Sequence, residues 1–190
     1  MGRGTRLTGH LPPSPSGGGR GWGLARRDFL ALAGISLASS ASVASQVEQL
    51  KPTQSAAFPA FSALDLEGRS TKVPAPGRAA IVNFWATWCP PCRAEMPLLQ
   101  QLTELYGDKF QLQLVNFKER PATIQRYMRD SAWSMPVLLD PLGEGAAAWG
   151  VKRYPTTVGF DAQGKPRWRV VGELDWSTAE AGKAVESLWR

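Results

Sequence analysis

The sequence predicts an α/β fold with a mixed central sheet, helices on both faces of that sheet and a strand hairpin before it. One observation is the nearly continuous apolar run at 79–85, which is typical of a central strand covered on both faces. A second is the alternation of strand-like and helix-like segments that begins near residue 58. A length of 190 residues suits one domain with a real core, so we expect a single domain over 58–190.

The first half of this domain contains the hairpin, the central strand, a helix and a second strand. Two short strand patterns, Phe61–Leu66 and Thr71–Val73, flank a turn at Asp65–Gly68. Beyond the central strand, apolar residues recur at helical spacing at Leu98, Leu99, Leu102 and Leu105. Gly107 ends that helix, and the alternating run 111–117 predicts the next strand.

The second half adds two more helix–strand alternations. The predicted elements are a helix at 121–129, a strand at 137–139, a brief helix at 143–150, a strand hairpin of 157–160 and 167–171, and a last helix reaching Leu188. Pro121 suits the first turn of its helix. The turn 161–164 closes the hairpin, and Ser177 is expected to cap the last helix.

The first 44 residues are predicted to be a targeting segment. Residues 1–24 are rich in Gly, Pro, Ser and Arg, so we expect them to be disordered. A basic pair, Arg26 and Arg27, then precedes a short apolar stretch and a zone of small residues, the order of a secretory signal peptide. The pair and the Asp-Phe-Leu after it resemble a twin-arginine (Tat) signal. We expect cleavage after Ala44 and a polar linker at 45–57.

An alternative is that the leader stays uncleaved and holds the protein at the membrane, facing the periplasm. The apolar stretch has only about ten residues, whereas a bilayer-spanning helix needs about 20. Export to the periplasm with cleavage is therefore the favoured prediction.

Composition excludes several other classes of protein. The formal charge is +6, but 17 of the 22 bases and 15 of the 16 acids follow residue 44, so no nucleic-acid-binding surface is expected. The single histidine, His10, lies in the leader, and the two cysteines are Cys89 and Cys92. A structural zinc site and a cysteine hydrolase both need more Cys or His than this, so we expect no metal and no cofactor.

The two cysteines predict a redox centre. A C-x-x-C pair near a strand–helix–strand unit is a sign of a thioredoxin-like motif. At the start of a helix both side chains lie on nearly one face, close enough for a disulfide, and the helix amides favour a thiolate on the first. We therefore expect Cys89 to be an exposed nucleophile and Cys92 the resolving thiol. The alternative, a structural disulfide, gains most by closing a long loop, and this pair closes almost none.

The segment Asn83–Pro97, which contains the cysteines, resembles the active-site segment of the TlpA/ResA/CcmG family of exported thioredoxin-like thiol-disulfide oxidoreductases. The similarity continues at 115–116, 136–140 and 154–157 and covers roughly 58–188. The resemblance implies a thioredoxin-like fold and a cis-proline, Pro155, that faces the two cysteines.

The resemblance also implies roles for three neighbouring residues. Glu95 is implied to lie beneath the cysteines and tune their protonation, because burial would raise its pKa; the alternative is a solvated glutamate on the helix surface. The backbone of Tyr154 would pair with a substrate strand, although many relatives carry a small or apolar residue there. Trp88, beside Cys89, is either a rim residue or a substrate contact.

The favoured function is reduction of disulfides in periplasmic proteins, for example in cytochrome c maturation, with electrons from a membrane donor protein. One alternative is a disulfide oxidase or isomerase, because thiol–disulfide exchange runs in both directions. A second is a metallochaperone whose thiols carry a soft ion such as Cu(I). The sequence leaves the direction open, since about 30 mV of potential already corresponds to about 1.4 kcal/mol.

Overall fold

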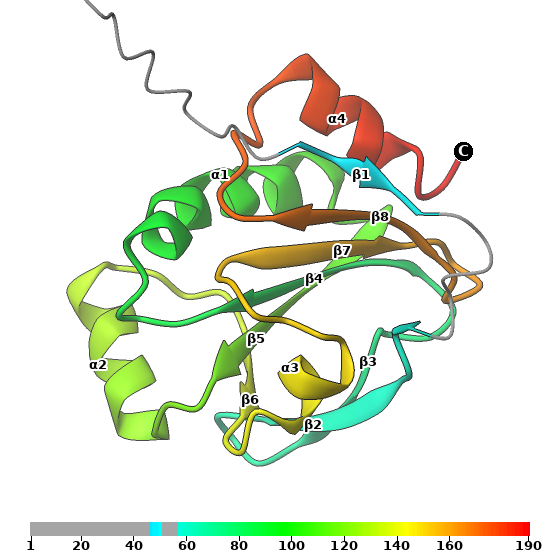
Figure 1. Ribbon diagram of the computed structural model, residues 1–190. Helices are drawn as coiled ribbons and strands as arrows, with labels where there is room; N and C mark the ends of the chain where they lie inside the picture. The colour runs from blue at the N-terminus through cyan, green and yellow to red at the C-terminus, as the bar shows by residue number, and fades with distance from the viewer. Residues whose placement is uncertain (1–45, 51–56) are drawn as a thin grey trace, which may run out of the picture. The chain divides into compact units, whose positions relative to one another are not determined.

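A computed structural model describes residues 46–50 and 57–190 of the chain (Figure 1). The predictions of a disordered leader, a signal peptide and cleavage after Ala44 therefore lie outside the described residues. Within the described part, eight strands form one mixed sheet and four helices pack against it. The strand order across the sheet is β1-β8-β7-β4-β5-β6-β2-β3.

The centre of the sheet combines parallel and antiparallel pairs. The central strands are β4 (Ala79–Trp85), β5 (Phe110–Phe117), β6 (Val137–Asp140), β7 (Thr156–Phe160) and β8 (Pro166–Val171). β4 runs parallel to β5 and antiparallel to β7, and β5 runs parallel to β6. The ends of β4, β5 and β6 consequently lie at the same edge of the sheet, where the loops that follow them meet.

Every residue of β4 is buried, as the apolar run predicted. Ile81 and Trp85 pack into the core on the face covered by α1, whereas Val82 and Phe84 pack into the core on the opposite face. Full burial of one such side chain is worth about 1.5–3 kcal/mol. The strand that leads to the cysteines is therefore anchored from both sides of the sheet.

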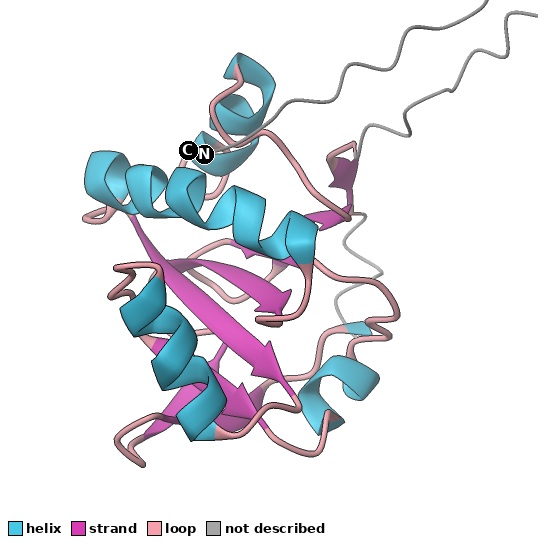
Figure 2. Cartoon of the chain, turned by 90° about the vertical axis from the view of Figure 1, so that its left-hand side faces the viewer, coloured by secondary structure: helices cyan, strands magenta, loops and turns pink. Residues whose placement is uncertain are grey.

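Helices cover both faces, also as predicted. They are α1 (Pro90–Tyr106), α2 (Pro121–Asp130), α3 (Glu144–Ala148) and α4 (Ala179–Glu186). Buried residues of α1, α2 and α4 belong to one core cluster, and Ala146 of α3 belongs to the other. Figure 2 views the sheet from the side of α1 and α2, with both helices in front of the strands.

The edges of the sheet differ from the prediction in one place. The expected hairpin is present as β2 (Phe61–Asp65) and β3 (Ser70–Val73), next to β6. However, the range 45–57, expected to be only a linker, contains the two-residue strand β1 (Glu48–Gln49), which pairs with β8. The outer edge of β8 offers backbone hydrogen bonds to any extended segment, so polar residues can pair there without burying their side chains.

The last helix starts one residue later than expected. Thr178, not Ser177, is its N-cap, and the Thr178 hydroxyl accepts the Ala181 N–H at 3.2 Å. Ser177 instead bonds the carboxylate of Asp175 through both its N–H and its hydroxyl. The carboxylate two residues upstream competes for Ser177, which leaves the cap position to the next hydroxyl.

Candidate active site

The two cysteines lie where β4 passes into α1, at the edge of the sheet where β4 ends. They form a disulfide with a Cα–Cα distance of 5.3 Å. Cys89 is the N-cap of α1, and its Sγ accepts the Cys92 N–H at 3.2 Å. Pro90 and Pro91 occupy the first two helical positions, where a missing N–H breaks no helical hydrogen bond. The helix amides therefore point toward Cys89, as the spacing predicted.

The expectation of an exposed Cys89 is wrong for this disulfide form. Cys89 is 3% exposed and Cys92 is fully buried. Both belong to the apolar cluster beneath α1, because formation of the bridge holds Cys89 against its buried partner. The exposed group at this position is Trp88, which is 60% exposed.

Glu95 is buried one turn beyond Cys92, on the same buried face of α1. One carboxylate oxygen accepts the Asn83 Nδ2–H at 2.7 Å, and the other accepts the Trp176 Nε1–H at 3.1 Å. Burial raises the pKa of Glu95 to about 7, and the hydrogen bonds from Trp176 and Asn83 only partly oppose this. The alternative hypothesis of a solvated glutamate on the helix surface is therefore wrong. The Glu95 carboxyl group can lose its proton near neutral pH.

Asn83 links this carboxyl group to the sheet. Its Nδ2 also donates to the Thr157 hydroxyl at 2.9 Å, while its Oδ1 is buried without a partner among the described residues. Rotating the amide by 180° would present that oxygen to a protonated Glu95. Sequence reasoning missed Asn83, although an amide within an apolar strand is itself a signal, because a buried polar group needs a partner.

Glu119, which sequence reasoning also missed, fixes the segment just before Cys89. Its carboxylate accepts the Thr87 N–H at 2.7 Å and the Thr87 hydroxyl at 2.5 Å. The Asn116 side chain donates to the same carboxylate at 2.8 Å. The loop that carries Trp88 is therefore tied to the end of β5.

Pro155 follows a cis peptide bond, as the resemblance implied. Thr156, the next residue, pairs with Phe84 of β4, so Pro155 lies just past the last paired residues on the cysteine side of the sheet. The Tyr154 ring packs 5.9 Å from the Trp88 ring. Burial, with a smaller contribution from the charge of Asp140, raises the pKa of Tyr154 to about 12, so its hydroxyl is neutral at pH 7.

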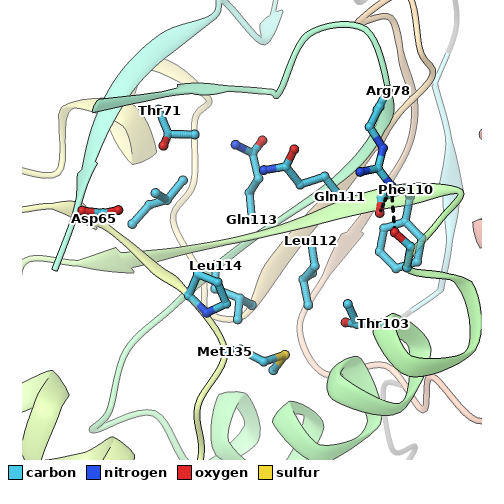
Figure 3. Close-up of a pocket in the computed structure, with 13 residues that line it drawn as sticks. Asp65, Thr71, Arg78, Thr103, Phe110, Gln111, Leu112, Gln113, Leu114 and Met135 are labelled. Atoms are coloured by element: carbon cyan, nitrogen blue, oxygen red, sulfur yellow. Dashed lines mark hydrogen bonds between the residues drawn. The ribbon is translucent and has the colours of Figure 1, made fainter. Parts of the chain in front are cut away.

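A cavity of about 270 Å³ lies along β5, and none of the site residues described above lines it (Figure 3). Its lining includes Phe110, which pairs with Ala79 at the start of β4, far from the end that carries the cysteines. Arg78 at its rim donates to the carbonyls of Gly107 and Phe110. In the described part of the chain, no three His, Cys, Asp or Glu side chains gather as a metal site would require.

Comparison with known proteins decides the family. The profile of the Redoxin family matches residues 53–185. The chain belongs to the Redoxin family. Thioredoxin-like protein YneN of Bacillus subtilis is 36% identical over 110 residues, which cover 56% of this chain and 64% of YneN, slightly less than two thirds. Thiol-disulfide oxidoreductase ResA of Geobacillus thermodenitrificans is 30% identical over 118 residues, covering 61% of this chain and 68% of that protein.

Solved structures agree with this Redoxin assignment. A putative thiol:disulfide interchange protein DsbE of Chlorobium tepidum superposes with a TM-score of 0.63 at 26% identity, covering 69% of this chain and 94% of that one. StoA of Bacillus subtilis superposes with a TM-score of 0.59 at 25% identity, covering 69% and 98%. The chain is thus a thiol-disulfide oxidoreductase of the Redoxin family with a thioredoxin-like fold. No helix in the described ranges is long and apolar enough to cross a membrane.

Proposed function

We propose that this Redoxin-family protein is an exported reductase that transfers electrons from Cys89 and Cys92 to disulfides of periplasmic proteins. Apocytochrome c before haem attachment is one such substrate. The observation that carries the proposal is the burial of both sulfurs one turn from a buried carboxyl group. An apolar environment and a nearby negative charge both disfavour a thiolate.

This burial supports the reducing direction. A dithiol that gains little from ionisation is stabilised less in its reduced form, so the pair gives up its electrons more readily. Above its pKa of about 7, Glu95 also places a carboxylate one turn from Cys92. The buried pair is therefore suited to reducing other disulfides.

The reaction is two successive exchanges. The Cys89 thiolate attacks one sulfur of the substrate disulfide, which forms a mixed disulfide and releases the other substrate sulfur as a thiolate that takes up a proton. Glu95 then accepts the Cys92 proton, and the Cys92 thiolate attacks Cys89 Sγ. This closes the Cys89–Cys92 bond and expels the second substrate sulfur as a thiolate, which takes up a proton as Glu95 returns its proton to the solvent, so that two electrons and two protons have moved to the substrate.

After each cycle the protein must be reduced again, and its leader must bring it to the periplasm. We propose that a dithiol on a membrane protein reduces the Cys89–Cys92 disulfide again. The basic, apolar and small-residue order of the leader supports export, with cleavage near Ala44 or retention as a membrane anchor facing the periplasm. Protein thiols and disulfides, rather than nucleic acids, are its partners.

One observation favours the opposite direction. Cys89 Sγ accepts an N–H at the start of α1, and such a bond stabilises a thiolate. If this effect dominated, the reduced form would be favoured and the protein would be an oxidase. Equilibration with glutathione distinguishes the two: a potential below about −260 mV supports the reductase, and a value near about −120 mV would establish the oxidase.

A trapping experiment tests the substrate class. The Cys92→Ser variant, expressed in its native compartment, is expected to accumulate mixed disulfides on Cys89 that mass spectrometry identifies. The matched control is Cys89→Ser, whose remaining Cys92 is fully buried and should capture nothing. Equal capture by both variants, or none by either, would rule out the proposed exchange with protein disulfides.

A further inference from the structure

Three aromatic rings lead away from the redox pair. The Trp88 ring lies 5.9 Å from the Tyr154 ring, which lies 4.8 Å from the Phe117 ring. We call these three residues the aromatic strip. Trp88 is 60% exposed, and the other two are partly exposed. The strip comes from three separate loops and strand ends that the sheet brings to one edge.

Lys118 stands at the far end of the aromatic strip and is held in place. Its ammonium lies 5.2 Å from the centre of the Phe117 ring, within cation–π range. Its backbone has a φ of 57° and donates to the Asp140 carbonyl at 3.0 Å. A Cβ on Gly143 would lie only 2.4 Å from Lys118 Cε, so the absence of a side chain there gives the lysine its space.

The Lys118 charge has no carboxylate at ion-pair distance within the described residues. Two acids close to Lys118 have other partners: Glu119 binds Thr87, and the Asp140 carboxylate accepts the N–H groups that start α3. Glu144 is the exposed acid on α3. Lys118 therefore rests on the Phe117 ring without a carboxylate partner in the described part of the chain, and its charge is available to a ligand.

Exposed basic and acidic residues lie in different loops around the redox pair. Arg120, Lys152 and Arg153 are exposed in the loops that flank the aromatic strip. The exposed acids Glu173 and Asp175 lie instead in the loop between β8 and α4, next to Trp176. Next to the aromatic strip, exposed bases therefore outnumber the exposed acid Glu144.

We propose that the aromatic strip and Lys118 form a subsite for polypeptide substrates that carry an apolar side chain near their disulfide and an acidic side chain farther along. This inference rests on the proposed function. Alternate side chains of an extended chain are about 6.6 Å apart, somewhat more than the 5.9 Å and 4.8 Å between the ring centres. Because alternate side chains face the same side, the acidic residue is expected about four positions from the substrate cysteine.

The test uses three disulfide-bonded peptides that differ only at the residue about four positions from one cysteine, which is Glu, Gln or Lys. The rate constant for their reduction by the reduced full-length protein is measured by stopped flow. We expect the Glu peptide to react about tenfold faster than the Lys peptide at low ionic strength, with Gln between them. The difference should shrink strongly at about 1 M salt, where the screening length is about 3 Å.

Variants of Lys118 test whether this residue causes the preference for the Glu peptide. Lys118→Glu should invert the order of the peptides, and Lys118→Asn should flatten it, because asparagine tolerates a positive φ. The matched control is Lys165→Glu, an equal charge change at an exposed position in the β7–β8 turn, at the other end of the sheet. This control should keep the wild-type ratio between peptides.

The possible outcomes separate the subsite from the function. Reduction of all three peptides at equal rates at low salt would overturn the subsite and leave the reductase intact. A preference that persists in both Lys118 variants, or that Lys165→Glu also removes, would overturn the subsite too. Failure to reduce any of the peptides would overturn the reductase function and the subsite together.

Discussion

Carboxyl groups have different roles at the two ends of the sheet: at one end they stabilise turns, and at the other a carboxyl group is buried beside the redox pair. At the end remote from the cysteines, Asp161 accepts the backbone N–H groups of Gln163 and Lys165. Asp65 closes the β2–β3 turn in the same manner. At the cysteine end, Glu95 accepts hydrogen bonds from two side chains and is buried.

The comparison of Asp65 with Glu95 shows which balance of burial and hydrogen bonds lets an acid carry a proton. Burial opposes the ionised form of Asp65, but hydrogen bonds from Arg69 and its charge outweigh burial, so the pKa of Asp65 lies below the usual value. At Glu95 burial outweighs the hydrogen bonds, and the pKa rises to about 7. A carboxyl group held ionised supports a turn, whereas one poised near neutrality can move a proton.

The largest expected effect is on the pH dependence of stability. The folded protein holds the Glu95 proton more tightly than the unfolded chain, so the stability from this group is fully present below about pH 4.5 and is lost as the pH rises through about 7. A shift from 4.5 to about 7 corresponds to about 3 kcal/mol of unfolding free energy. Urea unfolding of the oxidised protein from about pH 4 to about pH 9, a range that brackets both pKa values, measures this change.

Glu95→Gln should flatten this profile and be the more stable form at high pH. After a 180° rotation of its amide, Asn83 can accept a hydrogen bond from the new glutamine amide through Oδ1, which keeps the two side chains bonded. The described residues contain no histidine that would titrate in the same window. A wild-type stability that stayed constant from pH 4.5 to 8, or a variant with the same slope, would contradict the assignment to Glu95.

The remote end should respond differently. Asp161→Ala removes the acceptor of two backbone N–H groups and is expected to lower the unfolding free energy by about 1–2 kcal/mol. The slope of stability against pH near 7 should stay unchanged, because Glu95 is not touched. Gln163→Ala, in the same turn and exposed, is the matched control and should cost less than about 0.5 kcal/mol. A changed slope in Asp161→Ala would mean that the two ends are coupled.

The parts of the fold that could be predicted from the sequence are those set by residues close together in the chain. Period and turn chemistry located the central strand 79–85, the helix that follows Cys89 and both hairpins, because those signals act over a few residues. The contacts around the site act over long separations. Glu119 meets Thr87 from 32 positions away, and Trp176 meets Glu95 from 81 positions away. No local pattern encodes such partners, nor the burial of Cys89 in the disulfide.

Substitution of Trp176 is expected to have the smallest effect, and it tests which contact sets the pKa of Glu95. Trp176→Phe keeps most of the ring and removes the N–H that bonds Glu95. Since that hydrogen bond lowers the pKa of Glu95, its loss should raise the pKa by about 0.5–1 unit, the equivalent of about 1 kcal/mol. The measurement is the pH midpoint of the stability profile, together with that of the exchange rate.

The matched control is Trp168→Phe. Trp168 is fully buried, its ring lies 6.0 Å from the Trp176 ring, and its N–H bonds the Ala184 carbonyl instead of Glu95. Both variants lose one buried indole donor and similar ring area, so their stabilities should fall by similar amounts. Only Trp176→Phe should move the pH midpoint. Equal midpoint shifts in the two variants would show that ring packing, rather than the hydrogen bond, sets the proton affinity of Glu95.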